Sequence, residues 1–123
     1  MAFIPEDAKW YLAEIVQEFR VEDEDSSLVF INFILIRADS PEEAYERSLI
    51  EGKAHEYADF NTDGKRVTSI FRGLANLHVI YDELEHGSEI LYESKEDVSE
   101  AQIQAMVRPK SELNVFRPSE HDG

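Results

Sequence analysis

The sequence contains no cysteine among its 123 residues. This absence excludes a disulfide framework, a thiolate metal site and a cysteine nucleophile. Glycine is also scarce: five residues lie scattered along the chain and form no glycine-rich phosphate-binding loop. The first residues, MAFIPEDAKW, have neither the basic start nor the apolar core of a signal peptide. We therefore expect a cytoplasmic protein that needs no cofactor.

Basic residues are few, with 12 Lys and Arg against 27 Asp and Glu, and the net charge is −15. This balance argues against binding to nucleic acid and to an anionic membrane surface, which both require clustered positive charge. Acidic residues are concentrated in Glu22–Asp25 and in Asp82–Glu100, where eight acids accompany Lys95 as the only base. The surplus has two interpretations, a solvated surface or attraction to a basic protein partner.

The longest apolar run, Leu28–Ala38, is too short to cross a bilayer, which takes about 20 residues. Its β-branched and aromatic content predicts a strand that is apolar, and therefore covered, on both faces. The preceding apolar stretch, Trp10–Arg20, alternates with period two and predicts a strand with one well-buried face, although a helix remains open there. Two strands joined by the short polar loop around Glu22–Asp25 predict an antiparallel hairpin.

A helix start follows this hairpin directly. Ser40 is placed to cap the helix, Pro41 occupies its first turn, and Glu43 stands where a capping box needs a carboxylate. We predict a helix from Pro41 to about Tyr57, packed on the sheet through Ala44, Tyr45 and Leu49. The mid-helix Gly52 suggests a close approach to the sheet.

The remaining chain predicts three more strands and a second helix. Gly73 separates the first two strands, and a hairpin turn at Glu85–Ser88 precedes the third. Ser99 and Gln102 form a capping box for the second helix, which Pro109 ends. The expected strands are Lys65–Phe71, Leu77–Tyr81 and Ile90–Tyr92, with an edge strand or docked tail at Leu113–Phe116.

The sequence therefore predicts an α+β fold with an antiparallel sheet of about five strands and two helices on one face, in the order β-β-α-β-β-β-α. We expect one domain over residues 1–123, with loose termini at 1–9 and 117–123. Two helices cover such a sheet incompletely, and Leu28–Ala38 is apolar on both faces. This mismatch predicts a homodimer that buries the second face or the strand edge.

One stretch, Asp59–Gly64, has the spacing of the first half of an EF-hand calcium loop. The second half does not fit, because Ile70 stands where a bidentate glutamate is required and the basic Lys65 and Arg66 adjoin the loop. We expect a plain turn and no metal site. No pattern predicts a catalytic residue either, since the sequence lacks a nucleophile elbow and its acids are too numerous to be specific.

Two functional hypotheses follow from these residues. In the first, the chain is an interaction module for a basic protein, in the manner of an immunity protein that inhibits a basic toxin. In the second, it binds a small ligand or acts as an enzyme, with a pocket at a dimer seam near Trp10, Tyr11 and His78. The candidate partner-binding residues of the first hypothesis are Glu22, Asp23, Glu24, Asp25, Asp82, Glu83 and Glu85.

A set of turns, caps and core positions is characteristic: Trp10-Tyr11, Ala38–Tyr45, Asp63-Gly64, Phe71–Leu77 and Gly87–Ile90. In these positions the chain resembles a family of small bacterial proteins described only as a domain of unknown function. The similarity covers roughly residues 10–116, and it implies a fold and no activity, cofactor or catalytic residue.

Overall fold

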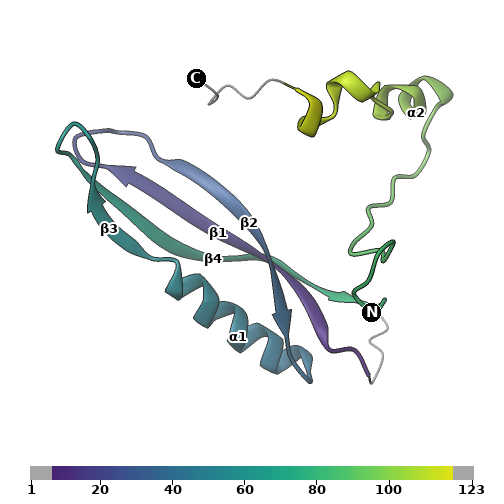
Figure 1. Ribbon diagram of the computed structural model, residues 1–123, viewed down its shortest axis with the longest axis horizontal. Coiled ribbons are helices and arrows are strands. Elements are labelled where there is room, and N and C mark those ends of the chain that lie inside the picture. Colours follow the sequence, from purple (N-terminus) through teal and green to yellow (C-terminus); the bar gives the residue numbers. More distant parts are fainter. Residues whose placement is uncertain (1–6, 118–123) are drawn as a thin grey trace. The chain divides into compact units, whose positions relative to one another are not determined.

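The computed structural model describes residues 7–117 and has an α+β fold with a curled, four-stranded antiparallel sheet and two helices. The strands are β1 (Trp10–Val21), β2 (Leu28–Arg37), β3 (Tyr57–Phe60) and β4 (Arg66–Ile80), in the order β2-β1-β4-β3. Helix α1 (Pro41–Ala54) runs along one side of the sheet and connects its two edge strands (Figure 1). The chain divides into two compact units, the first ending at Tyr92 and the second beginning at Glu93.

The predicted hairpin is confirmed. β1 and β2 pair antiparallel, from Trp10 opposite Arg37 to Phe19 opposite Leu28. Trp10–Arg20 is therefore a strand and not a helix. β1 lies in the middle of the sheet, with β4 on its other side, which explains why it is largely buried on both faces.

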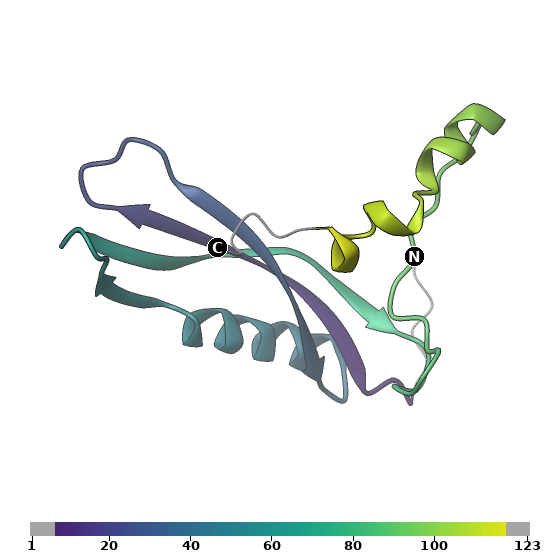
Figure 2. The same cartoon turned by 45° about the horizontal axis from the view of Figure 1, so that its top comes forward.

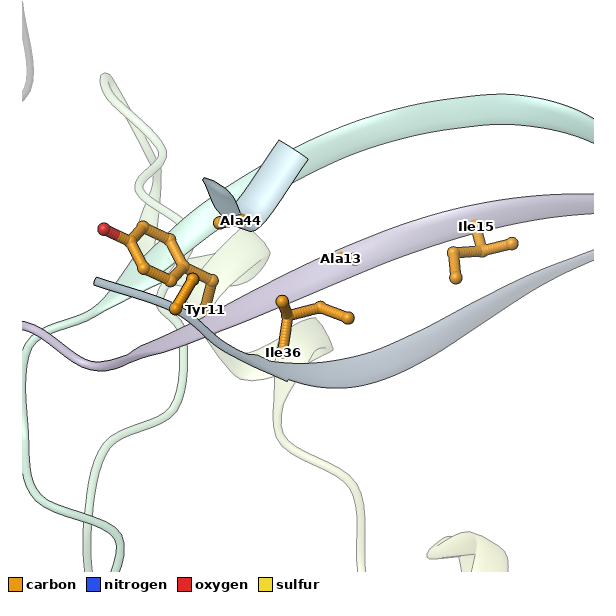
Figure 3. Close-up of a cluster of buried hydrophobic side chains, with 6 residues drawn as sticks. Tyr11, Ala13, Ile15, Ile36 and Ala44 are labelled. Carbon is orange, nitrogen blue, oxygen red and sulfur yellow. The ribbon is translucent and has the colours of Figure 1, made fainter. Parts of the chain in front are cut away.

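The core lies between the sheet and α1. It is a cluster of mostly small and aliphatic side chains, with Tyr11 packed beside Ala44 and Ile36 (Figure 3). The buried stripe of α1 consists of Ala44, Ser48 and Gly52, spaced one turn apart. The predicted contact through Tyr45 is wrong, because this side chain is 49% exposed. Small residues allow the helix to lie close to the sheet.

Gly52 shows how close that approach is. A Cβ atom placed on Gly52 would lie 2.4 Å from the ring of Phe71 in β4, well inside contact distance. The close approach that Gly52 suggested in the sequence is thus present.

The start of α1 follows the predicted chemistry with one difference. The Ser40 hydroxyl accepts a hydrogen bond from the Glu43 N–H at 3.1 Å and caps the helix. The Glu43 carboxylate accepts from the N–H of Asp39 at 2.9 Å, one residue before the position that a capping box uses. The helix ends at Ala54, three residues earlier than predicted, because Tyr57 already belongs to β3.

The predicted break at Gly73 is wrong, because β4 continues through it. Two register shifts against β1 leave Ala75 and Arg72 without a partner, as β-bulges do. The bulges bring Phe71, Leu74 and Leu77, three residues apart, against the core. A plain strand would place residues three apart on opposite faces.

The strand count and order also need correction. The sheet has four strands, not five: Ile90–Tyr92 forms no strand, so the predicted hairpin through Glu85–Ser88 is wrong. β3 was missed because its four residues follow α1 so closely that they extend the helical pattern. The observed order of the first unit is β-β-α-β-β.

The second unit, from Glu93 onward, contains α2 (Glu100–Met106) and two short 3-10 turns at Lys110–Glu112 and Asn114–Phe116. Its capping box is confirmed, with hydrogen bonds from Ser99 N–H to the Gln102 side chain at 2.8 Å and from Gln102 N–H to Ser99 Oγ at 3.2 Å. Of the two alternatives predicted for 113–116, the edge strand is wrong because Asn114–Phe116 forms a 3-10 turn, and the docked tail stays a prediction. Most of the two predicted loose termini lies outside the described residues, and a single domain over the whole chain stays a prediction.

Candidate interaction surface

The most distinctive surface of the first unit is β2, which forms one edge of the sheet. The sequence predicted this strand to be covered on both faces, and within residues 7–117 that prediction is wrong. An edge strand has a neighbour on one side only, so its side chains are shielded on one flank. Six large apolar side chains of β2 are between 44% and 62% exposed: Leu28, Val29, Phe30, Ile31, Phe33 and Leu35.

The backbone of β2 also has a free side, and its register identifies the groups concerned. The N–H of Ala38 donates to the carbonyl of Lys9 at 3.0 Å, so this residue pair is hydrogen-bonded across the ladder. Hydrogen-bonded pairs alternate along an antiparallel ladder, so every second residue of β2 turns its N–H and C=O away from β1. The residues with outward backbone groups are Val29, Ile31, Phe33, Leu35 and Arg37.

The carbonyl of Arg37 is observed to point away from β1, as this assignment requires. It accepts a hydrogen bond from Arg47 Nη1 of α1 at 2.7 Å, which closes the last outward position of the strand. The guanidinium of Arg37 lies 5.8 Å from the centre of the Trp10 ring. No carboxylate pairs with Arg37 within the described part of the chain.

The acidic loop Glu22–Asp25 lies at the opposite end of β2, in the turn that joins β1 to β2. Asp23 has a φ of +67°, the left-handed conformation that a tight turn requires. Glu22 accepts a hydrogen bond from the N–H of Arg66 at 3.3 Å. Between residues 7 and 117, no Lys, Arg or His side chain forms an ion pair with this loop.

The second acidic segment, with Asp82, Glu83 and Glu85, follows the end of β4. Because Ile80 pairs with Trp10, this segment lies at the other end of the 12-residue β1 from Glu22–Asp25 (Figures 1 and 2). The separation along the strand is about 35–40 Å, several times the Debye length of about 8 Å at physiological salt. The two segments therefore do not form the continuous negative field that would arise if they lay side by side.

A charged network that the sequence did not reveal lies on the face of the sheet opposite α1. The Glu18 carboxylate accepts hydrogen bonds from Ser27 Oγ, from Arg20 Nε at 3.1 Å and from Arg72 Nη1 at 2.7 Å. These hydrogen bonds, chiefly that of Ser27, lower the pKa of Glu18 from its usual 4.5 to about 2. Glu18 and Arg20 share a face by alternation, but Arg72 reaches them from a bulge, which no simple pattern predicts.

The residues of the predicted pocket do not gather in one place. Trp10 and Tyr11 are consecutive in β1, so their side chains point to opposite faces. Tyr11 and His78 help to line a cavity of about 370 Å³ between β1, β4, the start of α1 and residues 89–92, whereas Trp10 lines a different cavity. Burial is the main cause of the raised pKa of Tyr11, and His78 pairs with Glu14.

The described part of the chain contains neither a candidate metal site nor a helix that could span a membrane. Within residues 7–117, no group of three or more potential ligands could hold a metal ion. The side-chain oxygen of Asn61 accepts hydrogen bonds from the N–H groups of Asp63 and Lys65, both at 3.0 Å, and thereby closes the turn. In the same part of the chain, no helix has the length and apolar character that crossing a membrane requires.

The first unit is a small α+β domain with a curled antiparallel sheet and one helix. The chain belongs to the family described as "Domain of unknown function (DUF4288)", whose model matches residues 10–92. The match ends at Tyr92, where the first compact unit also ends, and so covers less than the resemblance implied. Comparisons with curated proteins and with solved structures found no match.

Proposed function

We propose that this domain is a protein-interaction module that binds its partner through the free edge of β2. One observation carries the proposal: β2 is an edge strand with six large apolar side chains exposed and no charged residue from Leu28 to Ile36. Edge strands of soluble proteins usually carry charges, proline or bulges that prevent pairing with another chain. An edge without them is suited to accept a partner strand by main-chain hydrogen bonds.

The acidic loop supplies the preference for a basic partner. Glu22–Asp25 directly precedes β2, so a strand docked on this edge would bring one of its ends close to the loop. In the cytoplasm, which remains the expected compartment, screening limits the attraction to about 8 Å, so it acts on the adjacent end of the partner. We assign Asp82, Glu83 and Glu85, at the far end of the sheet, no part in this interaction.

Co-purification tests this proposal. A tagged full-length chain is expressed beside an untagged copy in its native cell, and the retained proteins are identified. We expect a protein, either the untagged copy or a different polypeptide, to be retained by the wild type and lost with Phe33→Lys. The matched control is Phe60→Lys on β3, which makes the same substitution at a side chain that is 68% exposed on the opposite edge of the sheet.

The control should retain the same protein as the wild type. Retention of nothing by the wild type would contradict the proposal, and so would retention that Phe33→Lys leaves unchanged. Circular dichroism of both variants verifies that the fold is intact.

The cavity beside Tyr11 and His78 supports a second candidate function, the binding of a small ligand. Its volume of about 370 Å³ falls in the range of small-molecule sites, and its lining combines aromatic and aliphatic side chains with the carboxylates of Asp82 and Glu89. It lies on β1 and β4 rather than on the β2 edge, so it is independent of the interaction surface. Small aromatic amines that shift the amide resonances of Tyr11 and Val79 would support this function; a fragment screen without such shifts would exclude it.

A further inference from the structure

We propose that the occupant of the β2 edge is a second copy of this chain, paired antiparallel about a two-fold axis near Asn32 and Phe33. This inference rests on the proposed function and names its partner. The pairing would join the two four-stranded sheets along β2 into one continuous sheet, with the α1 helices on the same face.

The exposure of β2 indicates where its missing neighbour lies. Leu28 and Phe30 point to the face that α1 covers, Val29 and Ile31 point to the opposite face, and all four are exposed. A partner stacked on one face would leave the other face unprotected. A strand at the edge would shield both faces at once.

β1 provides an internal comparison for this argument. It has a strand on either side, and its side chains on the face opposite α1 include Leu12 at 7% and Glu18 at 9% exposure. Helix α1 packs on Tyr11 and Ala13 of the other face. β1, with a strand on either side, is thus much less exposed on the face opposite α1 than β2, which has a strand on one side only.

The outward backbone groups of β2 are suited to pairing with themselves. Val29, Ile31, Phe33 and Leu35 present alternating N–H and C=O groups, and a two-fold axis near the strand centre sets them opposite the same groups of the second copy. Each copy then donates and accepts the same set of hydrogen bonds. Because the interface uses one surface of each copy, the assembly closes as a dimer.

The charges at the ends of β2 fit the antiparallel orientation. In that arrangement, Arg37 of one copy lies beside the loop that precedes Leu28 of the other, which contains Glu24 and Asp25. Within residues 7–117, Arg37, Glu24 and Asp25 form no ion pair of their own. Although the chain as a whole is acidic, Arg37 of the second copy supplies a positive group to the acidic loop, and the contact is made twice by symmetry. Such charges at a rim fix orientation more than affinity.

Analytical ultracentrifugation of the purified full-length chain tests the inference. We expect wild type to sediment at micromolar concentration with twice the 14.2 kDa mass of one chain. Phe33→Lys sets two like charges together near the axis and should weaken the dimer by more than about 100-fold. Phe60→Lys, the matched control on the opposite edge strand β3, should leave the dimer unchanged.

A charge exchange tests the orientation. Arg37→Glu alone should weaken the dimer by about two- to five-fold, the effect of an exposed ion pair. Arg37→Glu combined with Asp25→Lys should restore the wild-type affinity, because the reversed pair meets again at both ends of the interface. Loss of the Arg37 contact with Trp10 could not produce such a rescue.

The outcomes separate this inference from the proposed function. A monomer across the micromolar range, a dimer that Phe33→Lys does not disrupt, or open-ended polymers would each overturn the two-fold pairing. If the co-purification then retains a different polypeptide that Phe33→Lys releases, the interaction module stands and its partner is not a second copy. If that experiment also retains nothing, both fail.

Discussion

At the scale of single residues, Gly52 determines how closely α1 lies on the sheet. We expect Gly52→Ala to destabilise the protein by about 1–2 kcal/mol, since overpacking costs about 1–3 kcal/mol and alanine's better helix propensity returns up to about 1 kcal/mol. The steric cause is the ring of Phe71, which a Cβ atom would meet at 2.4 Å. Urea unfolding measures the change.

Two controls accompany this substitution. Glu51→Ala, at the exposed neighbouring position, should alter the free energy of unfolding by less than about 0.5 kcal/mol. Combining Gly52→Ala with Phe71→Leu should cost less than the sum of the two single changes, because the smaller side chain makes room for the Cβ atom. Full additivity would show that the ring is not the obstacle.

Glu18 is the second residue whose surroundings predict a measurement. Its pKa is lowered to about 2, so the folded protein binds fewer protons than the unfolded chain between about pH 4.5 and pH 2. The stability that Glu18 contributes is therefore complete above about pH 4.5 and is lost as the pH falls through about 2. We expect Glu18→Gln to melt below the wild type at pH 7, with a difference that shrinks towards pH 2. A difference that is independent of pH would contradict the role of the carboxylate charge.

At this scale, the sequence correctly predicted interactions between residues that are close together in the chain. The caps at Ser40 and Ser99 depend on neighbours within three residues, and both are present. The network of Glu18 with Arg72 could not be predicted, because it joins residues 54 positions apart through a bulge whose register no local pattern defines.

At the scale of elements, the outcome differs between strands. The β1–β2 hairpin was predictable because two alternating apolar stretches flank a short polar loop. The burial of β2 was not, because its apolar composition is the same whether a strand lies centrally or at an edge. Only the strand order β2-β1-β4-β3 distinguishes the two cases. β4 looked broken because a glycine inside a strand pattern indicates a break, whereas Gly73 pairs with Val16 between two bulges.

The turn between β3 and β4 carries the prediction on metal binding. Asn61 uses its side-chain oxygen to hold the N–H groups of Asp63 and Lys65, and two basic residues adjoin the turn. We expect millimolar calcium to leave the melting temperature unchanged relative to sodium chloride of equal ionic strength. A rise of several degrees would show that the turn opens to bind the ion.

At the scale of the whole molecule, the first unit is a family domain with a free apolar edge, and the acidic segments Glu22–Asp25 and Asp82–Glu85 lie at opposite ends of its sheet. This division changes the role that the charge can have. The sequence suggested a broad field that attracts basic proteins. In the proposed function, the Glu22–Asp25 loop instead acts locally beside β2, where it sets the orientation of a partner that strand pairing selects.

Amide hydrogen exchange along β2 tests the central claim most directly. The amides of Val29, Ile31, Phe33 and Leu35 point away from β1, so they exchange rapidly in a free chain and slowly when a partner strand occupies the edge. The amides of Ile34 and Ile36, which face β1, serve as the internal control. We predict that raising the protein concentration slows exchange at the outward amides in the wild type and not in Phe33→Lys, while the inward amides stay protected in both. Outward amides that exchange rapidly at every concentration, with the proposed partner present, would contradict the account.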